Sequence, residues 1–328
     1  MRRLVAVIVM AAAGTLGSAG TAQACDCGVP GPIIGGPGVS GQNGVTYQAG
    51  PRRGGRTLVE SVQNGWPYGM VRIDGAYGIP RVARDGTTGG LSADGRTLIL
   101  QQVARTRPGG HTRFAVLAAR SLHLREVLRL PGSFSYDAMA PDGSTLYLIQ
   151  HLGARRDHSY LVRAYDLARG RMIGTPVFDP EDGPSPMNGY PLVRVTSPDS
   201  RWQYTLYGQG HGRTFIHALD TVARRAVCIA LPHSSGGRPG LELTTGDGWG
   251  LGVTRASRLV ATVDTSSFRV TPWPPPAAAQ PVRGGRPGEA GSPGGGLGVV
   301  LGVLALLALG GVGTVLGVCG SASAPQAR

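Results

Sequence analysis

A short turn motif recurs along the middle of this chain of 328 residues, at intervals of about 50 residues. The motif is an Asp-Gly type of turn followed by a short run of apolar and β-branched residues. Because Asp-Gly supplies the positive φ that a tight hairpin needs, each copy predicts the junction of two antiparallel strands. The clear copies lie at residues 92–100, 140–148 and 197–207, and weaker copies begin at Asn43-Gly44 and Asp247-Gly248.

A second motif alternates with the first and consists of an apolar run that ends at an aspartate. It occurs at residues 164–167, 218–221 and 262–265, with a degenerate copy at 117–120 and a candidate copy at 72–74. Together the two motifs predict about five units of four short strands, which is the pattern of propeller blades. Each blade buries its faces only against its neighbours, so we expect the units to close into a ring. The alternative is a β-sandwich in which the Asp-Gly turns recur by chance.

The turn pattern Ser/Ala-Pro/Ala-Asp-Gly, followed by Leu-Tyr and later by an Asp-Thr or Asp-Leu turn, resembles the YVTN/WD40-like repeats of secreted bacterial β-propellers, including the TolB-type class. The resemblance covers about residues 43–272 and is best at 92–100, 140–148, 197–207 and 215–221. It implies an all-β propeller of about five four-stranded blades. It does not imply an activity, because this fold serves scaffolds, lactonases, quinoproteins and glycosidases.

The two ends of the chain have the composition of targeting and anchoring segments. A basic start, an apolar core and the sequence Ala22-Gln23-Ala24 predict a cleaved signal peptide. Near the other end, an uncharged apolar run is long enough to cross a bilayer as a helix. We therefore expect a single-pass membrane protein with an extracytoplasmic body. The expected order is signal helix (1–24), Pro/Gly-rich arm (25–42), β-propeller (43–273), Pro/Gly-rich linker (274–296), transmembrane helix (297–319) and cytoplasmic tail (320–328).

All basic residues are arginine, and the formal net charge is +13. We interpret this as the codon usage of a GC-rich genome combined with a soluble basic surface. Arginines and aromatic residues are not interleaved as in a nucleic-acid groove, so no nucleic-acid partner is expected.

Export permits disulfides, and a Cys27–Cys228 bridge would tie the arm to the body. The pairing stays open because Cys25 is a second candidate, and lipidation of Cys25 stays open as well.

In repeats of this kind the first strand of a blade lines the central channel and runs into the Asp-Gly turn. Residues that precede these turns are therefore the candidate ligand contacts at the channel mouth. Acids, arginines and tyrosines together suit a polar ligand or a peptide. The alternative is that Asp85 and Asp137 pair with arginines or cap turns and bind nothing. The candidates are Arg84, Asp85, Tyr136, Asp137, Tyr190, Arg194 and Glu242.

No catalytic motif of the common hydrolases, nucleotide-binding proteins or zinc proteases is present. No cofactor or metal is expected, and Asp179, Glu181 and Asp182 indicate a solvated acidic loop rather than a calcium site. The favoured function is a membrane-anchored binding or assembly module whose partner is an envelope protein or a wall polymer. The alternative is a glycosidase- or lactonase-like enzyme that uses two of Asp85, Asp137 and Glu242. A third hypothesis is a structural protein that presents its N-terminal arm.

Overall fold

The computed structural model describes residues 31–34, 36–103, 110–152, 159–209, 213–232, 240–246 and 250–274. These residues form five antiparallel sheets, which we number in chain order. Sheet 1 is β1 (Val39–Ser40), β2 (Val45–Arg52), β3 (Arg56–Gln63) and β4 (Trp66–Asp74). Sheet 2 is β5 (Tyr77–Gly78), β6 (Thr97–Gln102), β7 (His111–Ala118) and β8 (His123–Pro131). Sheet 3 is β9 (Ser133–Met139), β10 (Thr145–His151), β11 (Ser159–Asp166) and β12 (Arg171–Met172), with β13 (Met187–Asn188) paired to β11. Sheet 4 is β14 (Tyr190–Thr196), β15 (Trp202–Gly208), β16 (Thr214–Asp220) and β17 (Arg225–Ala230). Sheet 5 is β18 (Leu241–Thr245), β19 (Gly250–Arg255), β20 (Arg258–Asp264) and β21 (Val270–Pro272).

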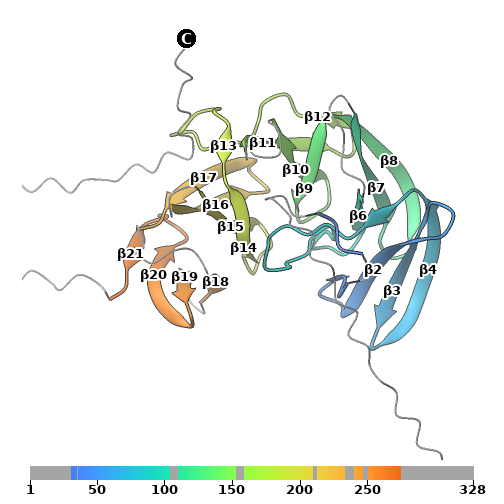
Figure 1. Cartoon of the computed structure of the whole chain (residues 1–328), viewed down its shortest axis with the longest axis horizontal. Helices are drawn as coiled ribbons and strands as arrows, with labels where there is room; N and C mark the ends of the chain where they lie inside the picture. The colour runs from blue at the N-terminus through green and yellow to red at the C-terminus, as the bar shows by residue number, and fades with distance from the viewer. Residues whose placement is uncertain are drawn as a thin grey trace, which may run out of the picture.

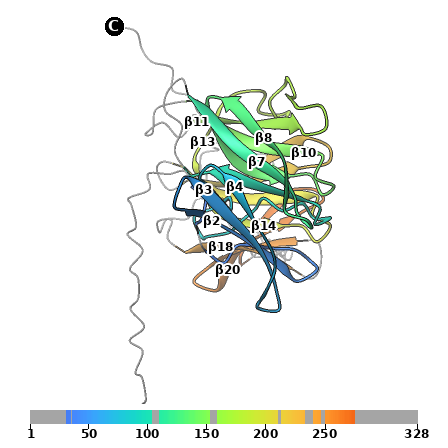
Figure 2. The ribbon, with the colours of Figure 1, turned by 90° about the vertical axis from the view of Figure 1, so that its right-hand side faces the viewer.

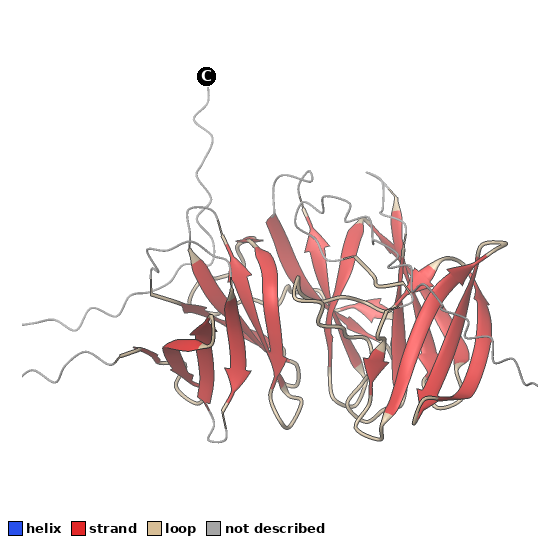
Figure 3. Ribbon diagram, turned by 60° about the horizontal axis from the view of Figure 1, so that its bottom comes forward, coloured by secondary structure: helices blue, strands red, loops and turns tan. Residues whose placement is uncertain are grey.

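The strands of each sheet follow one another in chain order, and the sheets succeed one another around a common centre (Figure 1). Sheet 1 lies at one end of this succession, in blue, and sheet 5 lies at the other end, in orange. Figure 2 shows the same sheets from the side, and every regular element of the described residues is a strand (Figure 3). This all-β architecture of five four-stranded sheets confirms the predicted propeller and excludes the sandwich.

The recurrent turn is the junction between the first and second strands of a sheet. Its fourth position takes a left-handed φ, of +73° at Gly44, +65° at Gly95 and +73° at Gly143. In sheet 4 the same position is Ser200, whose φ is +61°. Glycine adopts this conformation without a steric penalty, whereas serine does so at some cost. The unusual third copy of the motif therefore keeps the geometry of the others.

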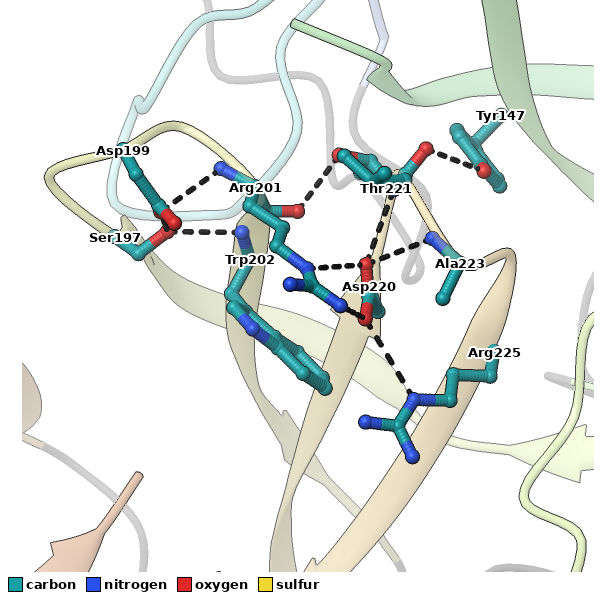
Figure 4. Close-up of polar contacts among 10 residues, drawn as sticks. Tyr147, Ser197, Asp199, Arg201, Trp202, Asp220, Thr221, Ala223 and Arg225 are labelled. Atoms are coloured by element: carbon teal, nitrogen blue, oxygen red, sulfur yellow. Dashed lines mark hydrogen bonds and ion pairs between the residues drawn. The ribbon is translucent and has the colours of Figure 1, made fainter. Parts of the chain in front are cut away.

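Side chains reinforce this turn in sheet 4 (Figure 4). The Ser197 hydroxyl donates to Asp199 over 2.5 Å, and it accepts a hydrogen bond from the Trp202 amide at 2.8 Å. The equivalent Ser92 of sheet 2 bonds Asp94 at 2.6 Å and the Thr97 amide at 2.9 Å. The serine thus joins the turn to the strand that follows, which is why the motif begins with serine in both copies.

The second motif ends the third strand of a sheet and meets the first motif there. In sheet 4 the Arg201 guanidinium bonds both Asp220 oxygens, at 2.9 and 2.6 Å, and the Ala223 amide donates to Asp220 at 2.9 Å (Figure 4). Burial alone would raise the pKa of the Asp220 carboxyl, but these hydrogen bonds hold that pKa below its ordinary value. The candidate copy at 72–74 was wrong, because Asp74 ends the fourth strand β4 rather than the third.

The apolar core is divided into four clusters, one between each pair of consecutive sheets. Val59 and Leu100 belong to the first cluster, Ile99 and Leu148 to the second. Tyr147 lies in the third, and its hydroxyl crosses to sheet 4 to donate to the Thr221 carbonyl at 2.8 Å. No cluster of the described residues joins sheet 5 to sheet 1. In this part of the chain the propeller is therefore an arc, and the two end sheets each bury one face.

A connection from sheet 2 fills the centre of the arc. Residues 79–90 leave β5 and reach β14 of sheet 4, where the Arg84 and Asp85 amides donate to the Pro191 and Leu192 carbonyls at 3.2 and 3.0 Å. Ile79 also exchanges backbone hydrogen bonds of 2.7 and 3.1 Å with Ile33. Ile33 and the strand β1 lie within the segment 25–42 that was expected to be an arm, so the ordered body begins before residue 43.

The described part of the chain contains no helix long and apolar enough to cross a membrane. The expected signal helix at 1–24, the transmembrane helix at 297–319 and the tail at 320–328 lie outside the described residues.

The two faces of β3 provide a test of the open arc. Val59 is fully buried against sheet 2, whereas Leu58 lies on the opposite face and is only partly buried. Val59→Ala should lower the free energy of unfolding by about 2 kcal/mol, since it removes buried methyl groups. Leu58→Ala should cost less than about 1 kcal/mol, measured by urea denaturation of the full chain. A cost for Leu58→Ala equal to that of Val59→Ala would mean that another sheet covers this face.

Candidate functional site

A cavity of about 230 Å³ lies at the centre of the arc, at the end where the first strands run into their turns. Four of the five sheets contribute to it. Sheet 1 supplies β1 and the turn after it, sheet 2 supplies its long connection, sheet 3 supplies β9, and sheet 4 supplies β14 and the start of β15. The cavity walls are Val39, Ser40, Gly41, Gln42, Val82, Thr87, Thr88, Gly89, Leu91, Ser92, Ala93, Tyr136, Asp137, Ala138, Met139, Arg194, Thr196, Ser200 and Gln203.

Asp137 reaches this position because β9 contains a bulge. Tyr147 pairs with Ala138 and Leu148 pairs with Tyr136, so Asp137 is the extra residue of β9. The partner strand β14 has a similar irregularity, where Leu192 is the extra residue. Bulges bend a strand and redirect a side chain, and they are frequent beside functional sites. The β9 bulge lies at Asp137 itself, whereas the β14 irregularity lies two residues before Arg194.

Asp137 and Arg194 form a buried ion pair between these sheets. Their side chains are 2% and 5% exposed, and the guanidinium bonds both the Asp137 carboxylate and the Asp137 carbonyl. The third nitrogen, Nε, donates to the Thr205 hydroxyl at 2.7 Å. Burial alone would lower the pKa of the Arg194 guanidinium, but the Asp137 carboxylate beside it raises that pKa above its ordinary value. Arg194 therefore remains charged, and its three nitrogens are used within the protein.

The second carboxylate oxygen of Asp137, Oδ2, is buried and accepts no hydrogen bond from the described residues. A buried carboxylate oxygen without a donor costs free energy, so such an atom calls for a water molecule or a ligand group. This unsatisfied acceptor is the strongest single sign that the centre of the molecule receives something besides the protein itself.

Tyr136 forms one wall of the cavity and is held on two sides. Its amide donates to Gln101 Oε1 at 2.9 Å. A Cβ placed on Gly89 would lie 2.6 Å from the Tyr136 ring, so the absence of a side chain at Gly89 lets the ring lie against the backbone of the loop. Burial raises the pKa of the Tyr136 hydroxyl to about 12. Tyr136 is therefore a neutral hydroxyl and a fixed apolar surface at any physiological pH.

A buried histidine lies further out on the same face of sheet 4. Thr205 pairs with Arg194 on one side and with His217 on the other, so the three side chains form a row across the sheet. The His217 Nε2 atom is buried and has no hydrogen-bond partner in the described structure. Burial, together with the nearby Arg194 charge, lowers the pKa of His217 to about 4, although Asp137 and Asp179 act in the opposite direction.

The other predicted channel residues have different positions. Arg84 and Asp85 are exposed at the tip of the sheet 2 connection, where Arg84 lies 4.5 Å from the centre of the Tyr190 ring. The Asp85 carboxylate accepts hydrogen bonds of 2.9 and 2.7 Å from the Thr87 amide and hydroxyl. It therefore caps a turn, as the alternative interpretation proposed. Tyr136, Asp137 and Arg194 are the predicted residues that the cavity brings together.

Glu242 is exposed on β18 of sheet 5 and is not among the cavity walls. Its carboxylate accepts a hydrogen bond from the Thr254 hydroxyl at 3.5 Å, within the same sheet. Glu242 and Asp137 therefore do not share a site in the described structure.

The expected solvated acidic loop is partly buried. Asp179 accepts hydrogen bonds from the Glu181 amide at 3.0 Å and from the Cys228 amide at 2.7 Å, and it is 7% exposed. Asp179, Asp182 and Cys228 lie close enough to hold a metal ion by distance alone. However, Cys228 is disulfide-bonded, so its sulfur is not a thiolate ligand. The other three cysteines lie outside the described residues, and the Cys27–Cys228 pairing stays a prediction.

The sequence reasoning missed several cavity walls. Thr87, Thr88 and Gly89 lie between Asp85 and the turn motif at 92–100, so the rule that selected Arg84 and Asp85 would also have found them. Gln203 follows the turn and lies in the second strand, where no sequence signal marks it. Gln42 lies in the weak first repeat, which the motif described poorly.

No family model and no curated protein matches this chain. Among solved structures, it is similar to hydrazine synthase of Kuenenia stuttgartiensis at 14% identity, with a TM-score of 0.45 and coverage of 75% of this chain and 67% of that one. BamB of Moraxella catarrhalis gives 17% identity, a TM-score of 0.39 and coverage of 71% and 62%. TolB of Acinetobacter baumannii gives 11% identity, a TM-score of 0.40 and coverage of 74% and 53%. The matches thus span 53–67% of the length of these three structures, and similarity of this degree carries no functional argument.

The ion pair at the cavity should dominate the stability of the sheet 3–sheet 4 junction. Asp137→Asn leaves the Arg194 charge buried without its partner, so we expect a loss of about 3–5 kcal/mol in the free energy of unfolding. The double variant Asp137→Asn/Arg194→Met should lose less than the sum of the two single variants. As a control, Asp74→Asn in the exposed Arg56–Asp74 pair should cost less than about 1 kcal/mol. Equal costs at the two sites in urea denaturation would contradict the buried pair.

His217 should make the protein acid-sensitive. In the unfolded chain its pKa is 6.5, and in the folded protein it is about 4. Between these values the unfolded state binds more protons than the folded state does. The contribution of neutral His217 to the free energy of unfolding is therefore complete above pH 6.5 and is lost as the pH falls toward 4. Wild type should lose up to about 3 kcal/mol more across this window than His217→Gln. The control is the exposed His123→Gln, which should follow the wild type; identical pH profiles for wild type and His217→Gln would disprove the assignment.

Proposed function

We propose that the chain is a membrane-anchored, extracytoplasmic binding module that holds its ligand in the central cavity. The observation that carries the proposal is the convergence of four sheets on one polar cavity with an unsatisfied buried acceptor beside it. Ligand sites are concave, largely preformed and few in each protein, and a point where several elements meet is their common location. We further propose that residues 297–319 anchor the body at the envelope, where the partner is a wall polymer or an envelope protein.

A second candidate function, hydrolysis of an envelope polymer, has less support. Glycoside hydrolysis needs two carboxyl groups on either side of the bond that is cut. Among the described cavity walls Asp137 is the one carboxylate, and it is engaged by Arg194. Asp85 and Glu242, the other two candidates, lie outside the cavity walls. The cavity therefore resembles a site for holding a molecule more than a site for cleaving one.

Filling the cavity tests the proposal. Thr196 is an exposed cavity wall at the end of β14, and Thr244 is an exposed residue of β18 outside the cavity. The full chain in detergent should bind soluble saccharide fragments of the cell wall. Thr196→Trp should weaken this binding at least tenfold by occupying the cavity, because a loss of about 1.4 kcal/mol corresponds to a tenfold change. Thr244→Trp should leave it unchanged.

The same samples separate binding from hydrolysis. Release of new reducing ends by the wild type, and its loss in Thr196→Trp, would replace the binding proposal with the hydrolase. Binding that persists unchanged in Thr196→Trp would remove the cavity as the site. The extracytoplasmic placement is tested separately. Protease is added to cells whose outer surface is exposed, and cleavage of the body is measured.

A further inference from the structure

The side chains that line the cavity indicate the chemical class of its ligand, an inference that rests on the proposed function. Two of its described walls are ionised, Asp137 and Arg194, and they neutralise each other. Three of the five Arg194 N–H groups donate within the protein, one of them to the Asp137 carboxylate, so the positive charge already has its counter-charge. A charged ligand would lose its hydration here without an opposite charge to replace it. The walls therefore favour an uncharged molecule.

The remaining polar walls are hydroxyls and amides. Two glutamines stand out, because parts of their amides are unused in the described structure. Gln203 accepts a hydrogen bond from Thr196 at 2.8 Å through Oε1, which leaves its NH₂ group available. Gln42 is exposed and makes no side-chain hydrogen bond there. An amide presents a donor and an acceptor side by side, and a hydroxyl group both donates and accepts. Adjacent hydroxyls on a ligand would match these amides. The hydroxyl walls are Ser40, Thr87, Thr88, Ser92, Thr196 and Ser200.

Apolar walls complete the cavity. Val39, Val82 and Leu91 line it together with the fixed ring of Tyr136. The ligand must therefore carry C–H surface as well as hydroxyl groups. The volume of about 230 Å³ is below the range of about 300–1,000 Å³ that drug-sized ligands occupy. A ligand of one ring fits this size, and a longer molecule could enter only by one end unit.

We propose that the cavity binds an uncharged, hydroxyl-rich ring, meaning a single neutral sugar unit or a cyclic polyol. The Gln203 and Gln42 amides bond its hydroxyls, and the Tyr136 ring and the aliphatic walls contact its C–H surface. Such a unit can be a free small molecule or the end of a polymer, and the binding chemistry is the same in both cases.

The test uses the full chain in detergent with defined probes. The neutral probes are glucose, N-acetylglucosamine and myo-inositol, and the charged probes are glucuronate, inorganic phosphate and spermidine. Binding is followed by ligand-detected NMR, which measures weak affinities. At least one neutral probe should bind saturably, and the charged probes should bind at least tenfold more weakly. Competition between that probe and a wall fragment then distinguishes a free ligand from a polymer end.

Substitution of the amides supplies the second arm. Gln203→Leu keeps the size of the side chain and removes its donors, so the affinity for the neutral probe should fall about tenfold. The control is Gln48→Leu, a partly exposed glutamine of β2 outside the cavity, which should bind as the wild type does. An unaltered thermal melting curve shows that Gln203→Leu is folded.

Three results would overturn the inference, and they have different meanings. If a charged probe binds best and Thr196→Trp abolishes that binding, the cavity is the site but the ligand class is wrong. If a neutral probe binds equally well to Gln203→Leu and Gln48→Leu, the amides do not recognise it. If Thr196→Trp alters the binding of no probe and no wall fragment, the proposed function itself fails.

Discussion

The buried contact between Asp137 and Arg194 determines how the centre of this molecule is built. It joins the bulged residue of the first strand of sheet 3 to the first strand of sheet 4. An ion pair in a low-dielectric interior stabilises only when its hydrogen bonds are complete. Each of the three Arg194 nitrogens donates one hydrogen bond within the protein, whereas Asp137 retains one oxygen without a donor in the described structure. The same contact therefore closes the sheet 3–sheet 4 junction and leaves a carboxylate oxygen without a hydrogen-bond donor beside the cavity.

The apolar cores impose a different constraint, which acts between neighbouring sheets alone. A twisted sheet of short strands buries its faces only against another sheet, so five such sheets must be arranged in succession. The succession of five sheets could be predicted from the repeats, because an Asp-Gly turn or an aspartate at a strand end depends only on the residues next to it in the chain. Asp166, Asp220 and Asp264 each end a third strand, as the second motif predicted. Closure of the arc has no local cause. It depends on the outer faces of sheets 1 and 5, which no turn motif describes.

The site, like the fold, was predictable only where it depends on local sequence motifs. The rule that first strands line the channel selected Tyr136, Asp137 and Arg194, and all three are walls of the cavity. It could not show that Asp137 and Arg194 pair with each other, because they are 57 residues apart and belong to different sheets. The rule also could not distinguish Asp85, whose carboxylate accepts a hydrogen bond from Thr87, from Asp137, which is a cavity wall. Gln203 has no signal in a single sequence, since a glutamine in a second strand looks like any surface residue.

The use of charge at the centre explains why the cavity is suited to recognition rather than to acid–base chemistry. A general acid or base must exchange a proton with its substrate, so its polar atoms must be accessible and its charge uncommitted. Here the one cation and the one carboxylate among the described walls are committed to each other, and Tyr136 stays protonated because it is buried. What remains for a ligand is a set of neutral donors and acceptors around an apolar wall. Such a set discriminates by hydrogen-bond geometry, since a group that leaves a buried amide or hydroxyl unpaired is rejected.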